Sequence, residues 1–66
     1  MTLEKEKNFY LETLNYNLWN YSIKQFMTSY ELYFYNKRVV CCTNLYDFVE
    51  ALRKYTVKQL KSYNLL

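Results

Sequence analysis

The chain of 66 residues contains no glycine, no proline and no histidine. Without glycine it cannot form the glycine-rich loops that hold phosphate groups. Without histidine it cannot build a catalytic triad on imidazole or a zinc site that uses histidine ligands. These absences exclude several large classes of enzyme, and they leave a chain that is unusually rich in aromatic residues, nine of them tyrosines.

The length allows a single small domain, residues 1–66, and the hydrophobic content of 52% is that of a globular protein. No apolar run approaches the roughly 20 residues that span a bilayer, so we expect no membrane association. The first seven residues carry charges of both signs and lack the apolar segment of a signal peptide, which favours a cytoplasmic location. Cys41 and Cys42 are sequence neighbours, and a disulfide between neighbours is strained, so we expect free thiols.

Residues 44–63 have the pattern of an amphipathic helix. Asn44 is a favourable N-cap, and Asp47 suits the positive end of the helix dipole. Leu52 lies in the middle of the apolar stripe and is therefore expected in the core. Thr56 followed by Gln59 is a weak capping pattern that leaves a break of the helix open. The stripe consists of Leu45, Phe48, Val49, Leu52, Tyr55, Leu60 and Tyr63.

Residues 30–42 have the pattern of a β-hairpin. Two runs of aromatic and β-branched residues are separated by Asn36 and Lys37, the only turn-like pair between them. Alternation along the first run predicts one face directed to the core and one directed outward. The core face consists of Tyr30, Leu32 and Phe34, and the outward face of Glu31, Tyr33 and Tyr35.

The region before the hairpin has two interpretations. The favoured one is a helix over about residues 3–28, which is broadly apolar or kinked. The alternative is a helix over 3–16 followed by a third strand at about 18–26, because apolar and polar residues alternate there. Trp19, Phe26 and Met27 lie off the main helical stripe, which indicates core residues or an exposed contact for a homodimer.

Together these patterns predict an α+β fold of helix, β-hairpin and helix, with both helices packed on a small antiparallel sheet. The alternative adds the third strand. A two-stranded ribbon alone is marginally stable, so both helices must cover it.

The chain offers few groups for catalysis. Asp47 and Glu50 are neighbours on one helix face and could bind a cation, but acids in a first helical turn are already explained by the helix dipole. Cys41 and Cys42 point to opposite faces of a strand, which is typical of one small core residue and one nearer solvent. We therefore predict no catalytic, metal or cofactor site.

Composition instead favours a protein that works by binding. Residues 34–66 hold six basic residues against two acidic ones, whereas residues 1–33 hold three against four. We expect stoichiometric contact with a partner protein, in the style of a phage or mobile-element inhibitor of a host enzyme or defence complex, such as an anti-CRISPR. The alternative is a small nucleic-acid-binding regulator, because rings beside cations also bind single strands. The candidate partner-binding residues are Tyr33, Tyr35, Lys37, Arg38, Lys54, Lys58 and Lys61.

Overall fold

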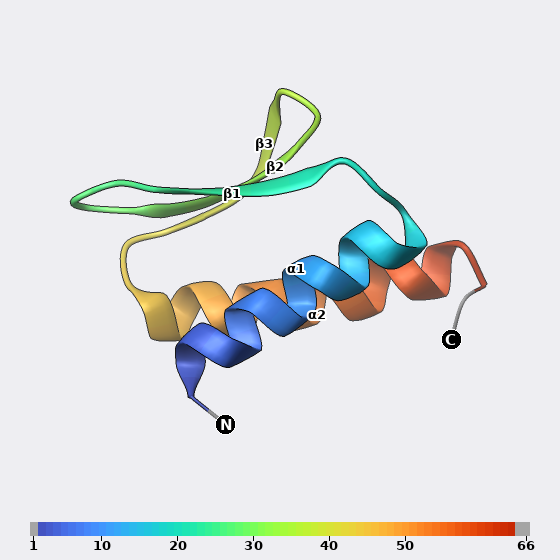
Figure 1. The fold of residues 1–66 in the computed structure, drawn as a ribbon, viewed down its shortest axis with the longest axis horizontal. Helices are drawn as coiled ribbons and strands as arrows, with labels where there is room; N and C mark the ends of the chain where they lie inside the picture. Colours follow the sequence, from blue (N-terminus) through green and yellow to red (C-terminus); the bar gives the residue numbers. More distant parts are fainter. Residues whose placement is uncertain (1, 65–66) are drawn as a thin grey trace.

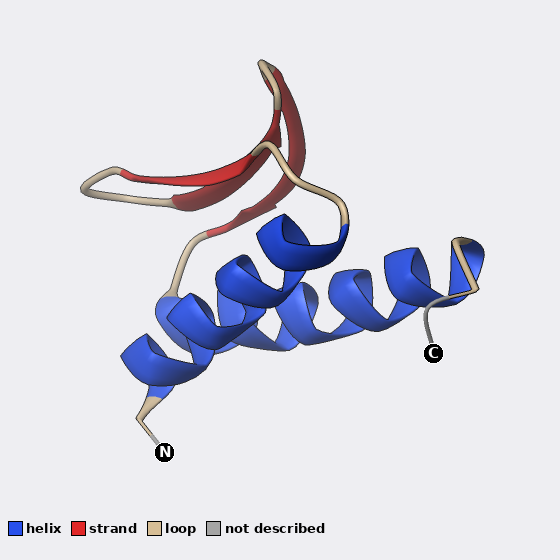
Figure 2. Ribbon diagram, turned by 45° about the vertical axis from the view of Figure 1, so that its right-hand side comes forward, coloured by secondary structure: helices blue, strands red, loops and turns tan. Residues whose placement is uncertain are grey.

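The computed structural model describes residues 2–64, in the element order α1-β1-β2-β3-α2. The sheet is antiparallel with the strand order β1-β2-β3, and both helices lie on one of its faces (Figures 1 and 2). The predicted α+β class is confirmed. The elements are α1 (Leu3–Asn17), β1 (Tyr21–Gln25), β2 (Tyr30–Phe34), β3 (Lys37–Cys42) and α2 (Leu45–Ser62).

The favoured interpretation of the N-terminal region, one helix to about residue 28, is wrong, and the alternative with a third strand is confirmed. α1 ends at Asn17 because Trp19 and Asn20 both adopt left-handed backbone conformations, with φ angles of 71° and 66°. A helix cannot continue through two such residues. The chain reverses direction at Trp19 and Asn20 and continues as β1. The first residue of β1, Tyr21, is opposite Phe34 of β2.

The hairpin of β2 and β3 is confirmed, with its turn one residue earlier than the sequence indicates. Phe34 is opposite Lys37, so the turn consists of Tyr35 and Asn36. Tyr35, rather than the asparagine, takes the left-handed conformation, with a φ of 56°. The register of β2 against β3 shifts between Leu32 and Tyr33, which is a β-bulge.

The core lies between the sheet and the two helices. Leu14, Leu32, Phe48 and Leu52 are fully buried, and the ring of Tyr30 stacks on that of Phe48 at 5.6 Å. Leu32 is thus in the core, and the other two residues of its face, Tyr30 and Phe34, pack against it, as alternation predicted.

α2 runs unbroken, so its C-terminal half is one continuous surface. At its start the Asn44 side chain accepts a hydrogen bond from the Asp47 N–H at 2.9 Å, and the Asn44 amide donates to the Asp47 carboxylate at 2.9 Å. The predicted N-cap is therefore present, and the break that the pair Thr56 and Gln59 left open does not occur.

The two edges of the sheet are protected in different ways. At β1 the Asn15 side chain imitates a neighbouring strand, because it accepts from the Tyr21 N–H at 2.6 Å and donates to the Tyr21 carbonyl at 3.0 Å. At β3 the bulge interrupts regular pairing, and Lys37 and Arg38 place two charges on the edge. Bulges and charged edge residues discourage the addition of another strand.

We expect Leu52→Ala to lower the free energy of unfolding by about 2–5 kcal/mol, because the side chain is fully buried and its loss leaves a cavity. Val57→Ala is the matched control, since Val57 lies on the same helix with 38% of its surface exposed. Urea unfolding followed by circular dichroism measures both. A cost below about 1 kcal/mol for Leu52→Ala would contradict its central place in the core.

Candidate functional site

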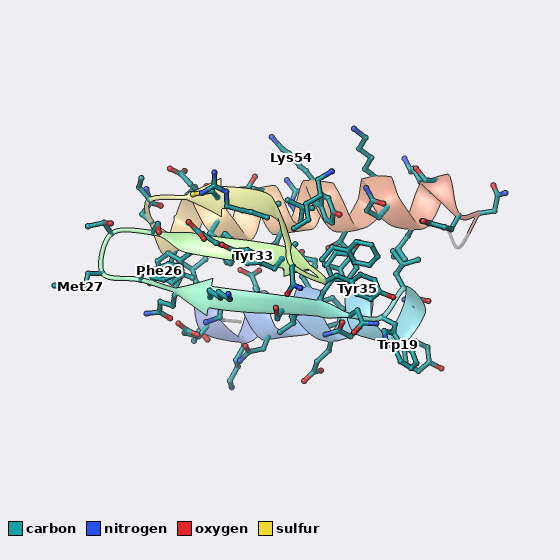
Figure 3. The ribbon with its side chains drawn as sticks, turned by 90° about the horizontal axis from the view of Figure 1, so that it is seen from above. Trp19, Phe26, Met27, Tyr33, Tyr35 and Lys54 are labelled. Carbon is teal, nitrogen blue, oxygen red and sulfur yellow. The ribbon has the colours of Figure 1, made fainter. Side chains whose placement is uncertain are left out.

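The open face of the sheet, opposite the helices, carries a group of polar side chains from all three strands. Lys24 is opposite Glu31, Glu31 is opposite Cys41, and Tyr33 is opposite Arg38. Figure 3 views the molecule from this side, with Tyr33 on the central strand. We call Lys24, Glu31, Tyr33, Arg38 and Cys41 the open-face cluster.

Glu31 is the centre of this cluster and is only 9% exposed, although no helix covers it. The Tyr33 hydroxyl donates to its Oε1 at 2.7 Å, and the Arg38 guanidinium donates to its Oε2 at 3.3 Å. The Cys41 thiol lies 3.7 Å from the same Oε2 and donates to it. A buried carboxylate is stable only when it is paired and hydrogen-bonded, and these three donors meet that need.

The hydrogen bonds of the cluster also fix its protonation. The bond from Tyr33, together with Arg38, holds the pKa of Glu31 below its ordinary value of 4.5, although burial acts in the opposite direction. The same bond raises the pKa of the Tyr33 phenol. The pKa of Glu31 is thus shifted further below neutral pH and that of Tyr33 further above it. A general acid or base that works near pH 7 needs a pKa close to that value.

Two of the predicted binding residues, Tyr33 and Arg38, lie together in the structure. Both are already bonded to Glu31 within the chain. Tyr33 is half-buried, bonded to Glu31 through its hydroxyl, and the Lys24 ammonium lies 4.6 Å from the centre of its ring. Arg38 is exposed yet paired with Glu31. A ring covered by a lysine is less accessible to a stacking base, and a paired guanidinium is less accessible to a phosphate.

The predicted lysines of α2 form a separate surface. Lys54, Lys58 and Lys61 are exposed at helical spacing, and Lys54 projects beyond β3, away from the open-face cluster (Figure 3). Within residues 2–64 none of the three is in an ion pair. The nearby Glu50 instead pairs with Arg53 at 3.1 Å.

The acids and thiols that could have supported other chemistry are used locally. Asp47 belongs to the cap of α2 and Glu50 pairs with Arg53. Cys41 is exposed on the open face and Cys42 is half-buried against the core, as strand alternation indicated. The part of the chain that the structure describes contains no group of three or more histidine, cysteine, aspartate or glutamate side chains that could hold a metal ion.

Four exposed rings that share a sequence motif form a third surface, which the sequence patterns did not predict. Trp19, Tyr35 and Tyr63 are 62–66% exposed, and Tyr16 is 89% exposed. Each is followed directly by an asparagine, so that the motif occurs four times. We call this surface the aromatic–asparagine end. It comprises Tyr16–Asn17, Trp19–Asn20, Tyr35–Asn36 and Tyr63–Asn64.

Topology gathers these four dipeptides. α1 and α2 run in the same direction, so their C-terminal ends lie together, and β1 starts where α1 finishes (Figure 1). The Tyr35 N–H donates to the Asn20 carbonyl at 2.9 Å, which joins the hairpin turn to the α1–β1 connection. Phe26 and Met27 are also exposed, but they lie at the opposite end of β1 from Trp19 (Figure 3), so the three do not form one apolar patch.

A series of ring contacts links this end to the core. Tyr35 packs edge-on against Phe34 with ring centres 4.8 Å apart, and Phe34 contacts Tyr21 at 4.8 Å. The Tyr21 and Tyr55 hydroxyls are 3.1 Å apart, and burial together with this hydrogen bond raises the pKa of Tyr21 well above its ordinary 10.0. Tyr35 consequently departs from the predicted outward face of β2, because it lies in the turn and contacts a core-facing ring.

The backbone at this end is strained in two places. Trp19 and Tyr35 both have positive φ, a conformation that costs a residue other than glycine about 1–2 kcal/mol. Asn20 and Asn64 share it at lower cost, because asparagine tolerates it. Strained residues cluster at binding sites in many proteins. The signal in the sequence was the repeated aromatic–asparagine pair in a chain without glycine.

A shallow groove of about 290 Å³ on the outer side of α1 adjoins this end. Its residues are Phe9, Glu12, Thr13, Tyr16 and Asn17. The groove holds a single carboxylate and no nucleophilic thiol, so it extends the aromatic surface rather than adding a catalytic centre.

Comparison with protein family models, with curated proteins and with solved structures gave no match. Between residues 2 and 64 there is no helix long and apolar enough to cross a membrane. A function for this protein is therefore inferred from the three surfaces described above.

We expect the free energy of unfolding to fall as the pH is lowered from about 4.5 through the depressed pKa of Glu31. The carboxylate has a lower pKa in the folded chain, so its stabilising effect is complete above its unfolded pKa and is lost on protonation. Urea unfolding between about pH 3 and pH 6 measures this dependence. Glu31→Gln should remove the part of the pH dependence that Glu31 causes, and Tyr33→Phe should make that part smaller. Equal pH dependence in the parent and Glu31→Gln would contradict the assignment.

Proposed function

We propose that this protein is a non-catalytic module that binds another protein in a stoichiometric complex. The observation that carries the proposal is that four aromatic–asparagine dipeptides with exposed rings lie at the same end of the fold. Tyrosine and tryptophan are the residues that most often dominate binding energy at protein interfaces. A domain of this size gains stability by burying its rings, so exposing four together favours a use for them.

The internal chemistry of the chain supports a binding role over a catalytic one. The most buried carboxylate, Glu31, accepts three hydrogen bonds and is held ionised, and the tyrosine hydroxyls beside it and in the core have raised pKa values. Neither kind of group is set for proton transfer near neutral pH. The narrower prediction, an inhibitor from a phage or mobile element that acts on a host enzyme or defence complex, stays a prediction.

A nucleic-acid-binding regulator is the second candidate, and the lysine stripe of α2 is the observation that favours it. Lys54, Lys58 and Lys61 are exposed, and Lys37 adds a cation at the hairpin turn. This candidate requires rings beside the cations for stacking. The ring that best fits that role by sequence, Tyr33, is half-buried and covered on one side by Lys24, which weakens the case.

The two candidates differ in their response to nuclease and salt. We expect an affinity pull-down from a bacterial lysate to retain its partner after nuclease treatment. We also expect the affinity of the purified pair to fall less than about tenfold between about 50 and 200 mM salt, because a tyrosine-based interface releases few counterions. A partner lost on nuclease treatment, or a steeper salt dependence, would favour the nucleic-acid candidate instead.

A further inference from the structure

We infer that the aromatic–asparagine end is the binding site, and that it recognises an uncharged, hydrogen-bonding surface of a folded partner protein. This inference rests on the proposed function and adds the location of the contact and the chemistry of the partner. It moves the site away from Tyr33, Arg38 and the lysine stripe, where sequence patterns had placed most of it.

The distribution of charge favours an uncharged partner surface. Residues 13–23, which cover the last turn of α1, the reversal and the start of β1, contain no charged side chain. The charged residues closest in sequence to the four dipeptides are Glu12, Lys24, Lys37 and Lys61. A strongly charged partner surface laid against residues 13–23 would be desolvated without an opposite charge in that segment to pair with.

The combination of side chains at this end also favours a folded protein as the partner. Tyrosine and tryptophan provide large, rigid contact areas at low cost in conformational entropy, and asparagine provides hydrogen bonds of both kinds, the combination that antibody loops use for folded antigens. Asn20, Asn36 and Asn64 are exposed, and within residues 2–64 their side chains make no hydrogen bonds. Their amides are therefore available to a partner.

Two of the exposed rings are also held in place before any partner binds. Tyr35 is held by its N–H bond to the Asn20 carbonyl and by its ring contact with Phe34. The Trp19 N–H is tied to the Leu14 carbonyl at 3.1 Å, in the last turn of α1. Rings on a fixed backbone lose little freedom on binding, and this raises the affinity that a given contact area provides.

Substitutions at the left-handed residues can test binding without disturbing the fold. Asparagine tolerates positive φ better than tryptophan or tyrosine, so Trp19→Asn and Tyr35→Asn remove a ring while keeping or easing the backbone conformation. The matched control is Tyr46→Asn. Tyr46 is 63% exposed, close to the 65% of Tyr35, but it lies in the first turn of α2, at the opposite end of the fold.

The probe is the partner recovered from the nuclease-treated pull-down, identified by mass spectrometry and purified, and titrated by calorimetry against the full chain. We expect Trp19→Asn and Tyr35→Asn each to weaken binding by about tenfold or more, as the loss of a central interface ring does. Tyr46→Asn should change the affinity less than about twofold, and Tm should not fall in the two test variants.

The contrary outcomes are distinct. If both test variants bind within about twofold of the parent while Arg38→Gln or Lys54→Gln abolishes binding, the inference is overturned and the proposed function stands. If the parent retains no protein after nuclease treatment, both are overturned. If the recovered partner is a second copy of the chain, and sedimentation shows a dimer that Tyr35→Asn dissociates, the location of the site is correct but the proposed occupant is wrong. The proposed occupant is also wrong if this end binds only neutral glycans.

Discussion

The backbone reversal at Trp19 and Asn20 determines where every later element lies. Two consecutive left-handed residues end α1 and direct the chain back across the helices as β1. The reversal places Tyr21 where Asn15 bonds both its N–H and its carbonyl, and where its ring reaches Phe34 and Tyr55. The register of β1 against β2 follows from that position. A helix that continued to residue 28 would leave β2 with one strand neighbour, β3.

Much of this fold follows from periodicity. α2 and the core face of β2 were predictable, because the positions of Leu32, Phe48 and Leu52 repeat at the spacing of a strand or a helix. The favoured interpretation missed the end of α1, since the usual signal for a helix end is a glycine and the chain has none, and only the alternative with a helix over 3–16 came within a residue of it. Tryptophan in the left-handed conformation is an outlier that no local propensity anticipates.

The candidate site was less predictable than the fold. Alternation correctly placed Tyr33 and Glu31 on the outer face of β2, but it could not show that Arg38 and Cys41 close over the carboxylate, because that depends on cross-strand register and on the bulge. The aromatic–asparagine end depends on four segments far apart in sequence. Only the parallel direction of the two helices and the pairing of Tyr21 with Phe34 bring them to the same end.

The position of Trp19 has a consequence for spectroscopy. It is the only tryptophan of the chain, and 66% of its surface is exposed in the folded state. Most of its surface is already in contact with water before the chain unfolds, so we expect tryptophan emission to change little on unfolding and to be a poor measure of folding here. The same exposure makes it a sensitive reporter of contact, since a partner that covers the reversal transfers the indole from water into an interface. Tryptophan fluorescence in this protein thus reports the binding of a partner at one end, whereas circular dichroism reports the cooperative unfolding of the core.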